Sequence, residues 1–201
     1  MRSFASDNNS GVHPAIMEAL TRANQDHALG YGDDSWTKEA VRKIKEIFVA
    51  DCEPLFVFNG TGSNVIALQL LTRPYNSIIC AETAHVYVDE CGSPVKMTGC
   101  QIRPVATPDG KLTPELIAPY LHGFGDQHHS QPGAVYLSEC TELGTIYTPE
   151  ELRAITSLAH QHGMRVHMDG ARIANACAAL GLSLKALTVD CGIDVLSFGG
   201  T

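Results

Sequence analysis

The sequence predicts an α/β fold built on a mainly parallel sheet with helices on both faces. From residue 55 to residue 198, short apolar runs alternate with helical patterns, as in strands joined by helices in a parallel sheet. The 201 residues are 44% apolar, so the chain can bury one sizeable core. The expected strands are LFVFN (55–59), SIICA (77–81), QIRPVA (101–106), AVYLSE (134–139), RVHMD (165–169) and DVLSF (194–198).

The clearest helix runs from Thr148 to His162. Thr148 can cap this helix, Pro149 suits its first position, and Glu151 completes a capping box. Its apolar stripe consists of Leu152, Ile155, Leu158 and Ala159. Two earlier helices are expected, over about 14–25 and 36–50. The segment 122–133 has no periodicity, so we expect a surface loop there.

Composition restricts the partners and the compartment. A net charge of -8 disfavours a nucleic-acid backbone or an anionic membrane surface as a partner, because both would repel the protein. The first residues lack the apolar core of a signal peptide, and no apolar run approaches the roughly 20 residues of a membrane helix. Seven cysteines without a CxxC pair favour neither a disulfide framework nor a cysteine-rich zinc site. We therefore expect a cytoplasmic protein with a small-molecule substrate.

The stretch NGTGSN (59–64) follows an expected strand and opens a helix. Gly60 and Gly62 let the backbone approach an anion, and Thr61 and Ser63 offer hydroxyl groups. The stretch lacks the lysine of a Walker loop, so it predicts a phosphate without identifying the molecule. The alternative is a glycine turn that binds nothing.

The stretch HMDGAR (167–172) ends another expected strand, where open α/β sheets bind their ligands. Asp169 needs a cationic or hydrogen-bonding partner if it is buried, and Arg172 could supply one or face the ligand. The alternative is that Asp169 caps the following helix, ARIANACAAL.

Two further loops follow strands at the same edge. His85 comes just after SIICAET, and Glu139, Thr141 and Glu142 lie in SECTELG (138–144), at the end of the strand AVYLSE and just after it. Paired carboxylates can perform acid or base chemistry, although they can equally bind backbone amides in a turn. A phosphate cradle, an aspartate and an arginine at one edge suggest pyridoxal 5'-phosphate, which also needs a lysine. The lysines at 38, 43, 45, 96, 111 and 185 lie on expected helices or loops outside this site.

Four motifs, NGTGSN, AETAHVYVDECG, HMDGAR and DVLSFGGT, resemble in their order and spacing the low-specificity L-threonine aldolases. These form the phenylserine-aldolase-like branch of the β-eliminating lyase family. The resemblance covers nearly the whole chain. It implies dependence on pyridoxal 5'-phosphate and an aspartate-aminotransferase-like fold (fold type I), and it implies a homotetramer assembled as a dimer of dimers.

The resemblance also implies a role for each matching residue. Gly60, Thr61 and Gly62 match the phosphate cup, His85 the residue stacked on the pyridine ring, Asp169 the partner of the ring nitrogen, Arg172 a cofactor and substrate contact, and Ser6 a substrate-carboxylate contact. Glu142 stands where many members carry a histidine proposed to contact the substrate's β-hydroxyl, so Glu142 is the candidate base. Tyr31 is a candidate for a site shared between subunits.

The resemblance further implies a division of the chain into residues 1–30, an N-terminal segment and helix, and 31–201, the cofactor-binding large domain. Family members carry the Schiff-base lysine directly after the turn that ends here at Thr201, so a lysine is expected at position 202. The smaller C-terminal domain is expected to be absent from this chain.

The expected reaction is cleavage of L-threonine or a related β-hydroxy-α-amino acid, such as phenylserine, to glycine and an aldehyde. Alternatives with the same cofactor are a β-eliminating lyase and an aminotransferase. From other classes, His167 and Asp169 could serve a metallohydrolase, although no convincing third ligand is spaced nearby, so we expect no metal. A non-catalytic fragment is the remaining alternative.

Overall fold

The computed structural model describes residues 6–199. Contacts divide the chain into two compact units, an N-terminal unit up to Leu55 and a C-terminal unit that begins at Phe56. This division falls later than the expected boundary between residues 30 and 31, which remains a prediction. Each unit is described by itself.

The N-terminal unit contains a short 3-10 helix, η1 (Asp7–Asn9), and two longer helices, α1 (Pro14–Ala23) and α2 (Ser35–Phe48). Both long helices were expected from the sequence. Asp34 caps α2 by accepting a hydrogen bond from the Thr37 N–H at 2.7 Å. This bond and the one from the Thr37 hydroxyl lower the pKa of Asp34 below its ordinary value.

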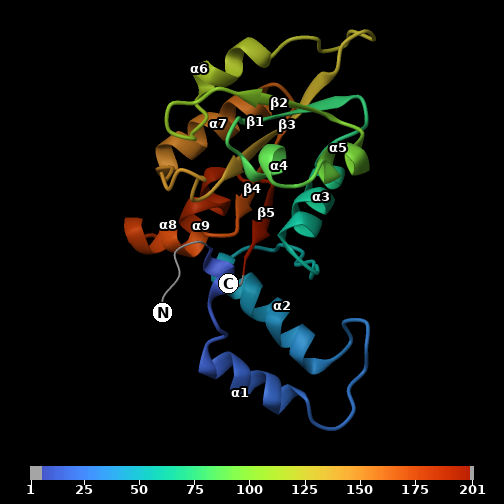
Figure 1. Ribbon diagram of the computed structural model, residues 1–201, viewed down its shortest axis with the longest axis vertical. Coiled ribbons are helices and arrows are strands. Elements are labelled where there is room, and N and C mark those ends of the chain that lie inside the picture. The colour runs from blue at the N-terminus through green and yellow to red at the C-terminus, as the bar shows by residue number, and fades with distance from the viewer. Residues whose placement is uncertain (1–5, 200–201) are drawn as a thin grey trace. The chain divides into compact units, whose positions relative to one another are not determined.

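The C-terminal unit is built on five parallel strands (Figure 1). They are β1 (Asn76–Ala81), β2 (Gln101–Val105), β3 (Gln131–Ser138), β4 (Arg165–Gly170) and β5 (Val195–Phe198), in the spatial order β2-β1-β3-β4-β5. Because every neighbouring pair is parallel, the carboxyl ends of all five strands lie along one edge of the sheet. The predicted fold class is confirmed.

Helices cover this sheet. They are α3 (Gly60–Leu71), α4 (His85–Val88), α5 (Ser93–Thr98), α6 (Pro114–Ile117), α7 (Pro149–Gln161), α8 (Ile173–Leu180) and α9 (Leu184–Leu187), with 3-10 helices η2 (Ala118–Tyr120) and η3 (Val189–Cys191). Helix α3 packs on β3, β4 and β5, and α7 packs on β4. The expected capping box of α7 is present between Thr148 and Glu151. The expected loop over 122–133 is confirmed up to Ser130, after which β3 begins.

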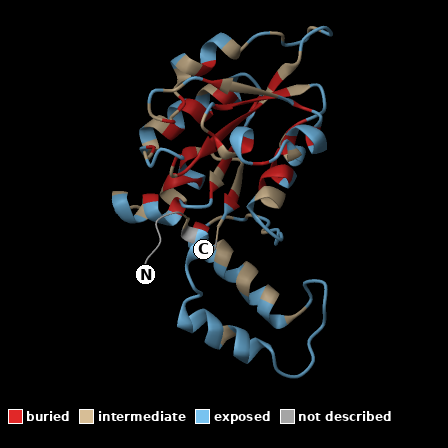
Figure 2. Ribbon diagram, viewed as in Figure 1, coloured by how far each residue is buried: buried red, intermediate tan, exposed pale blue. Residues whose placement is uncertain are grey.

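Burial follows the strands of the C-terminal unit (Figure 2). On β4, Val166 and Met168 are fully buried and belong to the apolar core with Leu152 and Ile155 of α7. His167 and Asp169 alternate with them, so these polar side chains point to the opposite face, where α3 lies. The sheet thus has an apolar face under α7 and a partly polar face under α3.

The expected strand LFVFN (55–59) was wrong. None of these residues is in a strand, and the side chains of Leu55, Phe56 and Phe58 are 59%, 60% and 99% exposed. A strand needs a neighbour for its backbone hydrogen bonds, and this segment pairs with no described strand. An apolar run of five residues carries no information about such a partner.

In the described part of the chain, no single helix has the length and apolar character to cross a membrane. By length and composition alone, the bent pair Ile173–Leu180 and Leu184–Cys191, with 105° between its two helices, passes the same test.

Candidate functional site

The site lies at the carboxyl edge of the sheet, where the strand order reverses. Strand β1 has β2 on one side and β3 on the other, so the connections that follow β1 and β3 lead to opposite sides of the sheet, the arrangement at which open α/β sheets bind ligands. His85 follows β1 and Glu142 follows β3. The His85 backbone N–H donates to Glu142 Oε1 at 3.0 Å, and the Ser138 hydroxyl donates to the same oxygen at 2.8 Å.

Asp169, near the end of β4, has three hydrogen-bond donors. Oδ1 accepts from the Ala171 N–H at 3.0 Å, and Oδ2 accepts from Asn64 Nδ2 at 2.9 Å and from the Tyr136 hydroxyl at 2.7 Å. A carboxylate oxygen has two lone pairs. Oδ2 is therefore fully used, whereas Oδ1 keeps one lone pair for a ligand.

The sequence alternative that Asp169 caps the next helix is not what the structure shows. Helix α8 begins at Ile173, and Asp169 lies within β4 with its side chain directed to the residues of α3 and β3. Its bond to the Ala171 N–H shapes the strand-to-helix turn instead.

Tyr136 is a neutral donor in this site. Burial, together with the neighbouring carboxylate of Asp169, raises the pKa of Tyr136 well above its ordinary value of 10. Glu142 and Glu90 contribute in the same direction. The phenol therefore keeps its proton at neutral pH. From β3 it donates the hydrogen bond that orients the Asp169 carboxylate.

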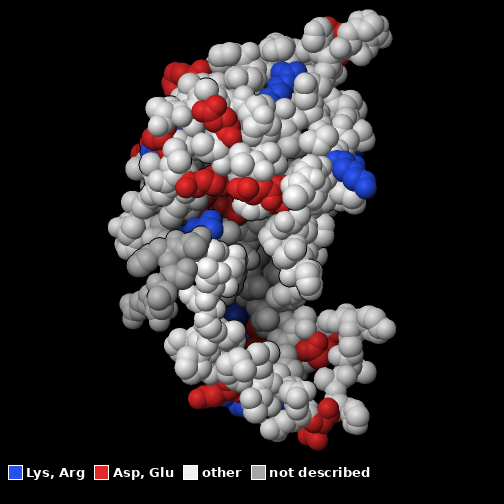
Figure 3. All heavy atoms as spheres, viewed as in Figure 1, with Lys and Arg blue, Asp and Glu red and all other residues white. Residues whose placement is uncertain are grey.

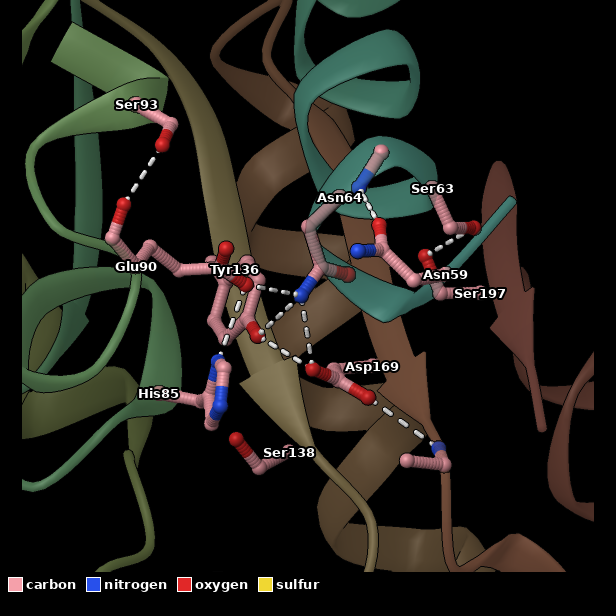
Figure 4. A network of polar contacts seen from close by, with 12 residues as sticks. Asn59, Ser63, Asn64, His85, Glu90, Ser93, Tyr136, Ser138, Asp169 and Ser197 are labelled. Atoms are coloured by element: carbon pink, nitrogen blue, oxygen red, sulfur yellow. Dashed lines mark hydrogen bonds and ion pairs between the residues drawn. The ribbon is translucent and has the colours of Figure 1, made fainter. Parts of the chain in front are cut away.

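Asn64, on the first turns of α3, connects two carboxylates (Figure 4). Its Nδ2 lies 2.9 Å from Glu90 Oε1 and 2.9 Å from Asp169 Oδ2, with the Tyr136 oxygen at 3.3 Å. Carboxylate oxygens only accept, so the amide nitrogen, not the oxygen, must face them. Each of the two Asn64 N–H bonds thus serves one carboxylate.

Glu90 is the second buried acid of the site, with 2% of its surface exposed. Its Oε1 lies 2.9 Å from His85 Nδ1 as well as from Asn64 Nδ2, while Oε2 has no partner within the described residues. The His85 ring is 40% exposed, so one nitrogen faces Glu90 and the rest of the ring reaches solvent. We call Glu90, His85, Asn64, Tyr136 and Asp169 the acid network.

The start of α3, which contains the NGTGSN segment, is the candidate anion cradle. Asn59 caps the helix, its side chain accepting from the Gly62 N–H at 2.8 Å and its carbonyl from the Ser63 N–H at 3.0 Å. Within the described residues this leaves the N–H groups of Gly60 and Thr61 for an anion, with the positive end of the helix dipole behind them. A Cβ added at Gly60 would meet nothing within 4 Å, so there is open space for a ligand.

The two glutamates after β3 do not form a pair. Glu139 is fully buried and accepts from the Tyr147 N–H at 3.1 Å, whereas Glu142 binds the His85 N–H. Burial raises the pKa of Glu139 to about 7. Each carboxylate thus accepts a hydrogen bond from a backbone amide, and Glu142 also accepts from the Ser138 hydroxyl. Thr141, between them, bonds to Thr145.

His167 is fully buried, and its Nε2 lies 2.9 Å from the Ser197 hydroxyl, which accepts from the Ser63 hydroxyl at 2.8 Å. Burial lowers the pKa of His167 to about 4, so the ring is neutral. Among residues 6–199, no group of three or more His, Cys, Asp or Glu side chains could hold a metal ion. The metallohydrolase alternative therefore has no ligand set in the described structure.

The remaining candidates are placed as follows. Arg172 lies in the turn before α8 with an exposed side chain, and Ser6 lies in the N-terminal unit, where its hydroxyl accepts from the Asn8 N–H. Tyr31 is fully exposed in the same unit.

Gly199 passes so close to the turn after β4 that a Cβ would lie 2.7 Å from the Ala171 oxygen, which explains why a glycine is needed there. Gly200 and Thr201 lie outside the described residues, and position 202 lies outside the chain.

Two lysines of the C-terminal unit are bonded elsewhere. Lys111 binds Glu151 at 2.7 Å and the Ile146 carbonyl, and Lys185 binds Asp190. No hydrogen bond joins a described lysine to the acid network. The network thus combines two carboxylates with donors from Asn64, Tyr136 and His85. Further Asp and Glu side chains lie in several separate places on the face drawn in Figure 3. Such a site suits a cationic group near Asp169.

Residues Asn64, Glu90 and Tyr136 were missed by the sequence reasoning as members of the site. Asn64 and Glu90 lie within motifs that were recognised, but nothing in their spacing reveals that they meet across 26 residues. Tyr136 sits two residues before the end of β3, on the same face as Ser138. That alternation is the one sequence signal that points to it.

Fold and site together define a class of protein: a parallel α/β structure whose carboxyl edge suits a phosphorylated cofactor with a basic ring nitrogen. The comparisons with known proteins agree. The family model described as Beta-eliminating lyase matches residues 3–201, and the chain belongs to this family.

A low specificity L-threonine aldolase from Pseudomonas aeruginosa is 46% identical over 201 residues, which make up 100% of this chain and 58% of that relative. A solved threonine aldolase from Leishmania major is 33% identical with a TM-score of 0.87, over 94% of this chain and 56% of that one. An aspartate aminotransferase double mutant from Thermus thermophilus, at 18% identity and a TM-score of 0.59 over 78% of this chain and 40% of that one, shares the fold alone. The resemblance in sequence is confirmed, and the chain spans 58% of the length of the Pseudomonas relative.

Proposed function

We propose that the complete protein is an aldolase that depends on pyridoxal 5'-phosphate. It cleaves L-threonine or related β-hydroxy-α-amino acids, such as phenylserine, to glycine and an aldehyde. The observation that carries the proposal is Asp169, which three donors hold at the carboxyl edge of β4 beside the anion cradle of α3. Similarity to two threonine aldolases over nearly the whole chain supports it.

The residues fit the cofactor. The N–H groups of Gly60 and Thr61 would hold its phosphate, and the Gly62 N–H is already bound to the Asn59 side chain. The free lone pair of Asp169 Oδ1 would accept from the ring nitrogen and favour a proton there. His85, whose side chain is 40% exposed, would lie against the ring, a role taken from the resemblance. Bound pyridoxal phosphate supplies an electron sink for the broken Cα–Cβ bond.

Other residues of the chain act on the substrate. Arg172 and Ser6 bind the substrate carboxylate, a role taken from the resemblance. Glu142 accepts the proton of the β-hydroxyl; its Oε1 is held by the His85 N–H and the Ser138 hydroxyl, which fixes the carboxylate for this transfer. Loss of that proton allows the aldehyde to leave.

Further proposals concern the assembly and the compartment. We propose a homotetramer built as a dimer of dimers, with Tyr31 in a shared site, and a cytoplasmic location. The resemblance supports the assembly. Seven free cysteines and a net charge of -8 support a reducing compartment and a small-molecule partner.

Product analysis tests the reaction. The complete protein, including the residues after Thr201, is incubated with L-threonine and with phenylserine in the presence of pyridoxal phosphate. Equal amounts of glycine and aldehyde support the proposal. A keto acid would instead indicate elimination or transamination, a candidate that the family description as beta-eliminating lyase favours.

A further inference from the structure

The acid network contains a carboxylate that the proposed reaction does not use. Glu90 is 2% exposed, lies between α4 and α5, and makes its contacts with two side chains from other elements, His85 and Asn64. Taking a carboxylate out of water is unfavourable unless hydrogen bonds or an opposite charge compensate. A buried acid beside a candidate cofactor residue therefore calls for a function.

Geometry limits where the proton between Glu90 and His85 can be. Glu90 Oε1 and His85 Nδ1 are 2.9 Å apart, so one of them donates to the other. Asn64 already donates to the same oxygen at 2.9 Å. A carboxylate oxygen only accepts hydrogen bonds, so with Glu90 as a carboxylate the donor is Nδ1.

We propose that Glu90 is a positioning residue that fixes the tautomer of His85 and, through Asn64, the orientation of Asp169. In this tautomer Nδ1 donates to Glu90, and Nε2 is the hydrogen-bond acceptor left for a ligand. A ligand group placed there must donate, as a hydroxyl does. This inference deepens the proposed function, and the contribution of Glu90 to catalysis rests on that function.

Asn64 extends the effect of Glu90 to Asp169. Its two N–H bonds are divided between the two carboxylates, at 2.9 Å each, and its Oδ1 has no partner within the described residues. The amide is therefore held by the two acids it joins. Removing the Glu90 acceptor leaves one Asn64 N–H without its hydrogen bond. The Asn64 amide, which donates to Asp169 Oδ2, is then less firmly oriented.

The test is a ¹⁵N NMR measurement of the His85 ring in the complete protein at pH 8, prepared without cofactor. The wild type is expected to show a protonated Nδ1 and a bare Nε2. In Glu90→Gln the amide oxygen still accepts, so Nδ1 stays protonated, but its proton signal moves upfield because a neutral acceptor binds more weakly. In Glu90→Leu the ratio of Nδ1–H to Nε2–H falls at least about tenfold, equivalent to about 1.4 kcal/mol.

Glu139→Gln is the matched control, because Glu139 is equally buried but bonds to the Tyr147 N–H, outside the acid network. It is expected to leave the His85 signals unchanged. A wild-type ring with a protonated Nε2, or a Nδ1 proton signal that is the same in Glu90→Gln, overturns the inference. Glu90→Gln is nearly isosteric and decides the question even if Glu90→Leu does not fold. Because no cofactor or turnover is involved, this outcome is independent of the product analysis that tests the aldolase.

Discussion

Two buried titrating groups should oppose each other in the pH dependence of stability. Burial lowers the pKa of His167 from 6.5 to about 4 and raises that of Glu139 from 4.5 to about 7. Between pH 4 and pH 6.5 the unfolded chain binds a proton at His167 that the folded chain does not. This group therefore lowers the free energy of unfolding as the pH falls. Glu139 behaves in the opposite way, because the folded chain keeps a proton that the unfolded chain has lost, so stability falls as the pH rises.

The magnitudes follow from the pKa differences. One pKa unit corresponds to about 1.4 kcal/mol, and each group changes the free energy of unfolding by about 2 kcal/mol between pH 5 and pH 7. In the wild type the two contributions nearly cancel. Single substitutions remove one of them and expose the other.

Urea unfolding of the 201-residue chain at pH 5, 6 and 7 measures this. His167→Gln keeps a hydrogen-bonding group for the Ser197 hydroxyl, and Glu139→Gln keeps an acceptor for the Tyr147 N–H. Relative to wild type, His167→Gln should lose about 2 kcal/mol on going from pH 5 to pH 7, and Glu139→Gln should gain about 2 kcal/mol. Identical pH slopes in all three proteins would refute the reasoning, since every other titrating group is common to them.

Two more outcomes are expected. Thr148→Ala removes the side-chain cap of α7 and should destabilise the chain by about 1 kcal/mol in urea at pH 7, whereas Ser157→Ala on the exposed face of the same helix should change little; equal effects would contradict the capping argument. Tyr136→Phe removes the 2.7 Å donor to Asp169 and should lower kcat/KM of the complete enzyme about tenfold, the value of one charge-assisted hydrogen bond. Tyr147→Phe, whose hydroxyl binds the Leu112 N–H instead, is the control, and an equal loss there would mean that the effect is general.

Patterns of residues close together in the sequence predicted individual helices and strands correctly where those residues alone determine the structure. The capping box at Thr148 and Glu151 marked the start of α7, and the alternation of strands and helices placed His85 and Asp169 at the same edge of the sheet. Such features depend on residues a few positions apart and on the rule that parallel strands end together.

The acid network could not be predicted in the same way. The contact between Asn64 and Glu90, and that between Asn64 and Asp169, join residues 26 and 105 positions apart, and each depends on how α3 packs on the sheet. The failed strand at 55–59 has a related cause, since pairing requires a partner elsewhere in the fold. Tertiary contact, rather than local preference, decides both.

The most direct test of the central claim is turnover of L-threonine by the complete protein when Asp169 is replaced by alanine. Asp169 is held by donors from α3, β3 and the turn after β4, and in the proposed reaction its Oδ1 keeps a proton on the cofactor's ring nitrogen. The account predicts that Asp169→Ala loses most of the glycine and acetaldehyde formation, while Glu139→Gln, a buried acid outside the site, keeps it. Near-normal turnover by Asp169→Ala would contradict the account.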